Sequence, residues 1–132
     1  MSQIFINLPV KDLNKSIEFF SKMGYTFNKQ FTSETATCMI ISETIFVMLL
    51  VENFFQSFTS KKIIDTGSNI ETIIALSASS KEKVNELVDK AISAGATLPR
   101  EPQDHGFMFT RTFEDIDGHV WEIFWMDPNH IQ

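Results

Sequence analysis

The sequence predicts an α+β domain in which one βαβββ module occurs twice, the two copies pairing into a curved mixed sheet with a central cleft. Strand-like and helix-like segments follow the same order in both halves of the 132-residue chain. Residues 5–12 and 73–80 also share an apolar pattern, and each precedes a helix-like run that closes with glycine, at Gly24 and at Gly95. A module that cannot bury its sheet face alone is expected to pair with its copy.

The first module opens with an alternating strand, since every second residue of 4–10 is apolar and can face a core. Asp12 stands where a helix N-cap belongs, and apolar residues then recur at helical spacing up to Gly24. Strand-like runs follow at residues 25–31, 36–41 and 44–51, the last two joined by a tight turn at residues 42–43.

The second module opens with a strand over residues 72–78. Ser79, with Glu82 three residues later, predicts a capping box for an amphipathic helix that ends at Gly95. Further strands are expected around residues 96–98, over 107–113 and over 119–125, with Asp117-Gly118 as the turn between the last two.

The predicted boundaries describe one domain of residues 1–132. It consists of a first module (1–52), a connector (53–69), a second module (70–127) and a tail (128–132). The connector holds three phenylalanines among polar residues, which suit either a short helix folded over a pocket or a linker pinned to the core. The sequence leaves these two alternatives open.

Composition excludes several classes of function. The formal net charge of −6 and the lack of a basic stripe argue against nucleic acid as a partner. No apolar run approaches the length of about 18 residues that a membrane-spanning helix requires. The single cysteine allows no internal disulfide, and the first residues lack the features of a signal peptide, so a cytoplasmic location is expected.

Four segments carry a resemblance to a known family: residues 8–13, 16–20, 74–77 and 114–122. The most specific feature is the Asp115-x-Asp117-Gly118 turn, followed four residues later by Glu122. Together these segments resemble the vicinal oxygen chelate superfamily of glyoxalases, bleomycin resistance proteins and extradiol dioxygenases. The resemblance covers essentially the whole chain and implies a homodimer with a small-molecule cleft.

The resemblance also locates the positions at which metal-dependent members bind a divalent ion. Two of these positions carry histidine in such members, and here they are Phe5 and Ile73. The position on the fourth strand falls on Met48, in a looser register that leaves Glu52 as an alternative. Glu122 alone matches the family's ligand pattern, and apolar side chains donate no lone pair to Zn, Ni, Fe or Mn. We therefore expect no cofactor, with a divalent metal ion as the alternative.

Glu122 is the first candidate for catalysis. It alternates with Val120 and Phe124 along the last predicted strand, so its carboxylate is expected to face a poorly solvated cleft. Such a group can act as a general acid or base. The alternative is a structural carboxylate held by Arg111, by Tyr25 or by water.

The remaining ionisable candidates are less specific. His105 precedes the seventh strand and is a candidate ligand contact or proton carrier at the mouth of the cleft, or else a solvated loop residue. His119 is expected at the surface where a strand begins, and His130 in the tail. Cys38 lies in an apolar strand and is expected to be packed and unreactive.

The aromatic and methionine content exceeds what the helix-covered sheet faces need, so part of it should line the cleft. Apolar cleft walls suit a flat apolar or aromatic molecule. The opposite face of the last strand, with Trp121, Ile123 and Trp125, is assigned to the core or to a dimer contact. The predicted cleft residues are Phe5, Asn7, Phe46, Met48, Leu50, Ile73 and Phe124.

Two functions remain in competition, with an orphan structural or interaction domain as a third. The first is a metal-free, homodimeric module that binds a small apolar or aromatic molecule, similar to bleomycin resistance proteins. The second is a lyase, isomerase or dioxygenase, similar to lactoylglutathione lyase, with Glu122 as acid/base or metal ligand. The sequence does not decide whether the protein is an enzyme, and it does not name the ligand.

Overall fold

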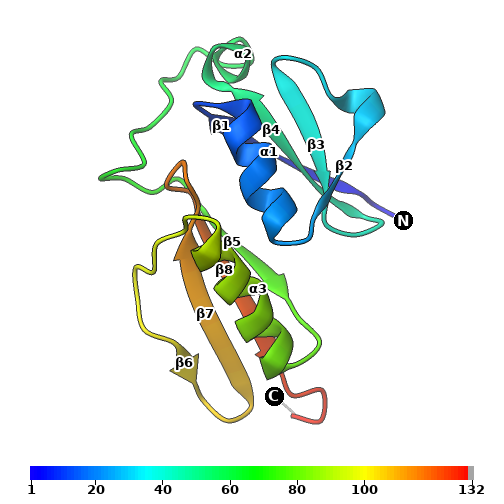
Figure 1. Ribbon diagram of the computed structural model, residues 1–132, viewed down its shortest axis with the longest axis vertical. Helices are drawn as coiled ribbons and strands as arrows, with labels where there is room; N and C mark the ends of the chain where they lie inside the picture. Colours follow the sequence, from blue (N-terminus) through cyan, green and yellow to red (C-terminus); the bar gives the residue numbers. More distant parts are fainter. Residues whose placement is uncertain (131–132) are drawn as a thin grey trace. The chain divides into compact units, whose positions relative to one another are not determined.

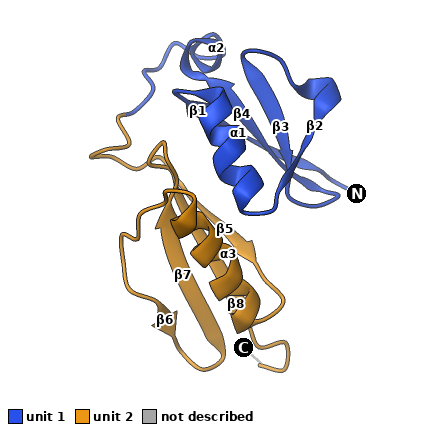
Figure 2. Cartoon of the chain, in the orientation of Figure 1, with its two compact units in different colours: residues 1–64 blue, residues 65–132 orange. Residues whose placement is uncertain are grey.

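The computed structural model describes residues 1–130 and consists of two compact units, Met1–Ile64 and Asp65–Gln132 (Figure 2). Each unit is a four-stranded mixed sheet with one long helix across it (Figure 1). The strand orders, β1-β4-β3-β2 and β5-β8-β7-β6, are the same when counted within each unit. The α+β class and the repeated βαβββ module are therefore confirmed, whereas the pairing of the modules around a central cleft stays a prediction.

The first unit contains seven elements of secondary structure. Its sheet pairs the first strand with the fourth in parallel, and its other pairs are antiparallel. The elements are β1 (Ile4–Val10), α1 (Leu13–Lys22), β2 (Thr26–Asn28), the 3-10 helix η1 (Lys29–Phe31), β3 (Ala36–Ile40), β4 (Ile45–Val51) and α2 (Glu52–Gln56).

The core of the first unit lies between α1 and its sheet. Helix α1 begins at the predicted cap, where the Asp12 side chain accepts a hydrogen bond from the Lys15 backbone N–H at 3.1 Å. It is followed by Gly24, whose φ of 105° favours a residue without a side chain. Its apolar stripe packs on β4 and β3, and the buried residues of the unit include Phe19, Phe20, Leu8, Val10, Val47 and Leu49.

The second unit repeats this plan with β5 (Ile73–Ser77), α3 (Lys81–Ser93), β6 (Gln103–Asp104), β7 (Met108–Glu114) and β8 (Val120–Met126). Helix α3 packs on β7 and β8 and buries Val84, Val88 and Ala91. Trp121 and Ile123 are almost fully buried, which confirms their place in the core, whereas Trp125 on the same face is only half-buried. None of the helices described between residues 1 and 130 is long and apolar enough to span a membrane.

Two predicted strands were wrong in extent. The strand expected over 25–31 stops at Asn28, because the Asn28 side chain accepts a hydrogen bond from the Gln30 backbone N–H at 2.9 Å and caps η1. The strand expected around 96–98 is a single bridge between Thr97 and Glu114. Pro99 has no N–H with which to continue that ladder, so the edge strand β6 forms later in the chain.

The predicted capping box was wrong by one residue. Helix α3 begins at Lys81, and its N-cap is Ser80, whose hydroxyl accepts a hydrogen bond from the Lys83 backbone N–H at 3.0 Å. Ser79 is therefore one residue too early to serve as the cap, and Glu82 lies in the first turn of the helix.

Candidate functional site

A cavity of about 410 Å³ lies within the second unit, on the sheet face opposite α3. Its floor comes from three adjacent strands: Ile73 of β5, Val120 and Glu122 of β8, and Thr112 and Glu114 of β7. Its walls come from two loops. They contribute Thr66, Gly67, Ser68, Asn69 and Ile70 on one side, and Pro99 and Arg100 on the other.

Two polar side chains of the floor stand next to each other. Thr112 and Glu122 are register partners on β7 and β8, which places their Cβ atoms about 5 Å apart on one face of the sheet. Thr112 is 5% exposed, and its hydroxyl has no hydrogen-bond partner among the residues described. Glu122 is partly buried, and its carboxylate makes no hydrogen bond or ion pair with residues 1–130. The unpaired Glu122 carboxylate therefore stands beside an unpaired Thr112 hydroxyl that is buried beneath the floor.

The interpretation that Arg111 holds Glu122 is wrong. Arg111 pairs with Ile123, one residue along β8, so its side chain lies on the opposite face of the sheet. There its guanidinium donates to Asn85 at 3.0 Å and to Asp89 at 2.9 Å, both on α3. Arg111 therefore fastens the helix to the sheet and leaves Glu122 uncompensated.

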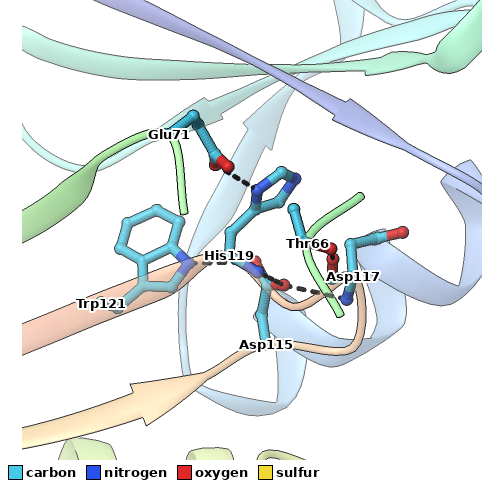
Figure 3. Close-up of polar contacts among 6 residues, drawn as sticks. All are labelled: Thr66, Glu71, Asp115, Asp117, His119 and Trp121. Atoms are coloured by element: carbon cyan, nitrogen blue, oxygen red, sulfur yellow. Dashed lines mark hydrogen bonds and ion pairs between the residues drawn. The ribbon is translucent and has the colours of Figure 1, made fainter. Parts of the chain in front are cut away.

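The loop that forms one wall of the cavity is attached at both ends to the β7–β8 turn (Figure 3). At one end the Thr66 hydroxyl donates to the backbone carbonyl of Asp117. At the other end Glu71 Oε1 is 2.7 Å from His119 Nδ1. These contacts tie residues 66–71, which belong mostly to the predicted connector, to the strand that carries Glu122.

His119 is buried, with 2% of its surface exposed, so its predicted surface position is wrong. Its burial follows from a network centred on Asp115. One oxygen of Asp115 accepts the backbone N–H groups of Asp117 at 2.9 Å and His119 at 3.0 Å, and the other accepts the indole N–H of Trp121 at 2.9 Å (Figure 3). Burial raises the pKa of the Asp115 carboxyl, and the nearby His119 and the hydrogen bonds oppose that rise.

Gly118 allows the loop to approach the turn. Its φ is 80°, and a Cβ atom added there would lie 2.6 Å from Thr66 Oγ1. Sequence reasoning identified the Asp-x-Asp-Gly turn but missed Thr66, Glu71 and the role of His119. The turn motif was the available signal, and it does not indicate which distant residues dock on it.

The predicted cleft residues of the first unit share the sheet face opposite Leu8 and Val10. The rings of Phe5 and Phe46 stack with centroids 4.7 Å apart, and Phe5 is about half exposed. Asn7 is exposed beside its register partner Met48, and its amide donates to the Phe5 carbonyl at 3.3 Å. Leu50, on the same face, is buried.

The two registers fix which residue of β4 corresponds to Glu122. Phe5 of β1 pairs with Phe46 of β4, and Ile73 of β5 pairs in the same way with Val120 of β8. Two residues after Phe46 stands Met48, and two residues after Val120 stands Glu122. Glu52 lies in α2 and not on the sheet face.

The four positions at which metal-dependent members of the resembled family carry ligands are thus Phe5, Met48, Ile73 and Glu122. Three of these side chains offer neither oxygen nor nitrogen, so the set does not fit Zn, Ni, Fe or Mn. In the part of the chain that the structure describes, no group of three His, Cys, Asp or Glu side chains is arranged to hold a metal ion.

The other candidates lie apart from the cavity. His105 is exposed in the turn before β7, which begins at Met108, four residues or about 13 Å of strand from Thr112. The ring of His130 stacks on Phe107, with centroids 4.1 Å apart. Phe124 lies on the same face as Glu122 but does not line the cavity.

Cys38 lies in β3 and is 1% exposed, as the sequence predicted. Burial raises the pKa of its thiol, which disfavours the reactive thiolate.

Comparison with known proteins gives a consistent fold. The family model of the Glyoxalase/Bleomycin resistance protein/Dioxygenase superfamily matches residues 3–123. No curated protein matches the chain. A hypothetical protein from S. aureus is 26% identical, with a TM-score of 0.80 over 95% of this chain and 94% of that chain.

Two more distant structures share the fold alone. A glyoxalase/bleomycin resistance protein/dioxygenase family enzyme from Burkholderia phytofirmans PsJN is 18% identical, with a TM-score of 0.78 over 96% of this chain and 99% of that one. The fosfomycin resistance protein FosX from Mesorhizobium loti is 13% identical, with a TM-score of 0.65 over 95% and 90% of the two chains.

Proposed function

Since the chain belongs to the glyoxalase/bleomycin resistance protein/dioxygenase superfamily, we propose that it is a binding module of that superfamily which holds a small organic molecule without a resident metal ion. One observation carries the proposal. Of the four positions at which metal-dependent members carry ligands, three are apolar side chains: Phe5, Met48 and Ile73. A single carboxylate, Glu122, cannot complete a coordination shell.

The cavity of the second unit supports binding of a small molecule. Its volume of about 410 Å³ falls within the range of about 300–1,000 Å³ typical of ligand sites. Ile70, Ile73 and Val120 supply apolar contact, while Thr112 and Glu122 supply polar groups on the floor. This lining is more polar than the sequence led us to expect, so the ligand needs a polar group as well as an apolar body.

Metal analysis of protein purified without chelators tests the proposal. We expect a substoichiometric metal content. We also expect that the unfolding temperature does not change when Zn, Ni, Mn or Fe(II) is added at a concentration that would saturate a metal site of ordinary affinity. A metal at about 100 times its Kd would stabilise the fold by about 2.7 kcal/mol. Stoichiometric metal, or a saturable shift that the Glu122→Gln variant abolishes, would refute the proposal.

A second candidate function is supported by the unpaired state of Glu122. A carboxylate without a hydrogen bond or ion pair to the described residues keeps its lone pairs available to remove a proton from a bound molecule. The chain would then be a metal-free isomerase or lyase. Glu122→Gln separates the functions, because it should abolish turnover in an enzyme of this kind. Turnover that survives the substitution would exclude Glu122 as the acid or base.

We also propose, on the family resemblance, that the protein is a homodimer. Light scattering coupled to size-exclusion chromatography would give twice the chain mass of 15.1 kDa. A monomeric mass at micromolar concentrations would contradict this proposal.

A further inference from the structure

We propose that the cavity of the second unit selects a small cationic amine, whose ammonium group binds between Glu122, Glu114 and Thr112 while its apolar body contacts Ile70, Ile73 and Val120. This inference rests on the proposed function and names the chemical class of the ligand. It follows from three properties of the cavity: its unused acceptors, its charge and the spacing of its floor.

The acceptors come first. The Glu122 carboxylate accepts hydrogen bonds and donates none when it is ionised, and it has no partner among the described residues. The Thr112 hydroxyl is buried and has no hydrogen-bond partner among the described residues, a condition that destabilises the fold where nothing compensates it. A ligand group rich in N–H donors satisfies both residues. An acceptor-only group such as a carboxylate satisfies the hydroxyl alone and is repelled by Glu122.

Charge favours the same ligand. The cavity lining contains two carboxylates, Glu114 and Glu122, and one cationic side chain, Arg100. Arg100 lies on the opposing loop and is exposed to solvent, where its charge is strongly screened. The carboxylates stand on the sheet floor, so a cation bound there relieves their mutual repulsion.

The spacing of the floor suits one ammonium group. Glu122 and Glu114 are diagonal neighbours across β7 and β8, which places their Cα atoms about 7–8 Å apart. One oxygen of Glu114 already accepts the Thr97 hydroxyl at 3.0 Å, which leaves the other oxygen for a ligand. An ammonium has three donors, and the three floor residues offer an acceptor each. Because Oγ1 of Thr112 is buried, its contact with the ammonium group requires a rotation about the Cα–Cβ bond that exchanges the places of the hydroxyl and the methyl group.

The apolar body of the ligand has a defined place. Val120 pairs with Ile73 in the register of β5 and β8, so the two side chains are neighbours on the floor. Ile70, in the wall loop, and Ile73 are each about half exposed. Covering such side chains removes apolar surface from water, which favours binding of an apolar ligand body. An arylalkyl amine therefore matches the site better than ammonium ion alone.

Three aromatic probes of similar size test the inference on the full chain at neutral pH: benzylamine, benzyl alcohol and benzoate. Binding is followed by ¹H–¹⁵N chemical-shift titration, with the expected perturbations at residues 112, 114, 120 and 122. We expect benzylamine to bind at least about tenfold more tightly than benzyl alcohol, and benzoate to bind most weakly. Raising the salt concentration should weaken benzylamine binding alone.

Substitutions test whether the residues of the cavity floor cause the preference for benzylamine. Glu122→Gln should weaken benzylamine binding at least about tenfold without changing that of benzyl alcohol, and Thr112→Val should weaken it by a smaller factor. Glu101→Gln removes an exposed carboxylate outside the cavity and should change neither. Each variant is first compared with the wild type by urea unfolding. If Glu122→Gln does not fold, Thr112→Val and the salt dependence carry the test.

The outcomes separate this inference from the proposed function. Binding of benzyl alcohol or benzoate at these residues with affinity equal to or above that of benzylamine would overturn the amine inference and leave the binding module in place. Binding of benzylamine that Glu122→Gln does not weaken would also overturn it. If none of the three probes perturbs the cavity residues at millimolar concentration, the inference fails, while metal content continues to test the proposed function separately.

Discussion

Asp115 shapes the turn between β7 and β8 because one buried carboxylate accepts three N–H groups. Asparagine is nearly isosteric, but its amide nitrogen would face one of those donors. We expect Asp115→Asn to lower the free energy of unfolding by about 1–3 kcal/mol, the cost of an unpaired buried donor. Urea unfolding at neutral pH measures the loss. Glu101→Gln, an exposed carboxylate in the same unit, is the control and should have little effect.

The same carboxyl predicts a pH dependence. Burial raises its pKa in the folded state above the ordinary value of 3.8. In the pH interval between the ordinary pKa and the raised pKa, the folded state keeps a proton that the unfolded state has lost. The contribution of Asp115 to stability therefore falls as pH rises through the interval and is constant above it.

The difference in unfolding free energy between wild type and Asp115→Asn should accordingly shrink as the pH rises from the ordinary carboxyl pKa toward neutrality. Urea unfolding at closely spaced pH values measures this difference. A difference that grows with pH would mean that the hydrogen bonds from Trp121 and the turn outweigh desolvation.

Gly118 and Gly106 form a matched pair for a second prediction at the scale of single residues. Both have φ near 80°, but a Cβ atom at Gly106 would meet nothing within 4 Å, whereas one at Gly118 would lie 2.6 Å from Thr66 Oγ1. Gly106→Ala should cost about 1–2 kcal/mol for the left-handed backbone alone. Gly118→Ala should cost more, since the wall loop must also move.

Thr66→Ala tests the contact, because it removes the hydroxyl nearest to a side chain at residue 118 and leaves the Cβ and carbonyl oxygen of residue 66, at 3.0 and 3.2 Å. In the Thr66→Ala background the additional cost of Gly118→Ala should fall toward that of Gly106→Ala. Thermal unfolding of the four variants measures this coupling. Additive effects would show that the turn and the wall loop are not in contact.

At the scale of elements, the start of α3 carries a prediction about two neighbouring serines. Ser80 caps the helix through the Lys83 N–H, while the neighbouring Ser79 is exposed and makes no hydrogen bond with the described residues. Ser80→Ala should lower the free energy of unfolding by about 1 kcal/mol, and Ser79→Ala should leave it nearly unchanged. The reverse order in a urea titration would restore the capping box predicted from the sequence.

The sequence predicted those elements whose pattern is set by burial. The alternation in β1 and the helical spacing in α3 agree with the structure because the apolar residues of each element lie on its buried face. The short strands β2 and β6 were misplaced because their limits depend on single hydrogen bonds. Asn28 ends one strand with its own side chain, and β6 forms only beyond the Pro99–Pro102 break.

The candidate site was predictable to the extent that it lies on a strand. Ile73 was assigned to the ligand face from the family resemblance, and Glu122 from the resemblance and its alternation with Val120 and Phe124. Both line the cavity. Thr112 was missed because its importance comes from its position beside Glu122, which only the register of β7 and β8 reveals. The wall loop was missed because its attachment to His119 and Asp117 joins residues about 50 positions apart in the chain.

At the scale of the whole molecule, the repeat is what makes the metal positions comparable. The registers of the two sheets place Met48 and Glu122 at matching points, and likewise Phe5 and Ile73. The duplicated module therefore retains one carboxylate among four matching positions. Within the second unit, Ile73 and Glu122 both line the cavity, which is why the function is argued from the cavity and not from the fold.

Each unit has its own helix-covered core, and the boundary between them falls at residue 64. Lys61 and Lys62 lie just before this boundary, are exposed and belong to no helix or strand. Trypsin requires an accessible, extended backbone, so we expect its first cut after one of these lysines. Arg100 is also exposed in a loop, but the acidic Glu101 follows it directly and disfavours cleavage.

Mass spectrometry of early digestion products should therefore show a pair of fragments that meet at residue 61 or 62. The far-UV circular dichroism of the nicked protein should match that of the intact chain, because the cut leaves both cores whole. Replacing both lysines by glutamine should slow the appearance of these fragments and leave the other cleavage rates unchanged. A first cut within α1 or α3 would instead show that a core opens before the connector is cleaved, and the units would then not be independently compact.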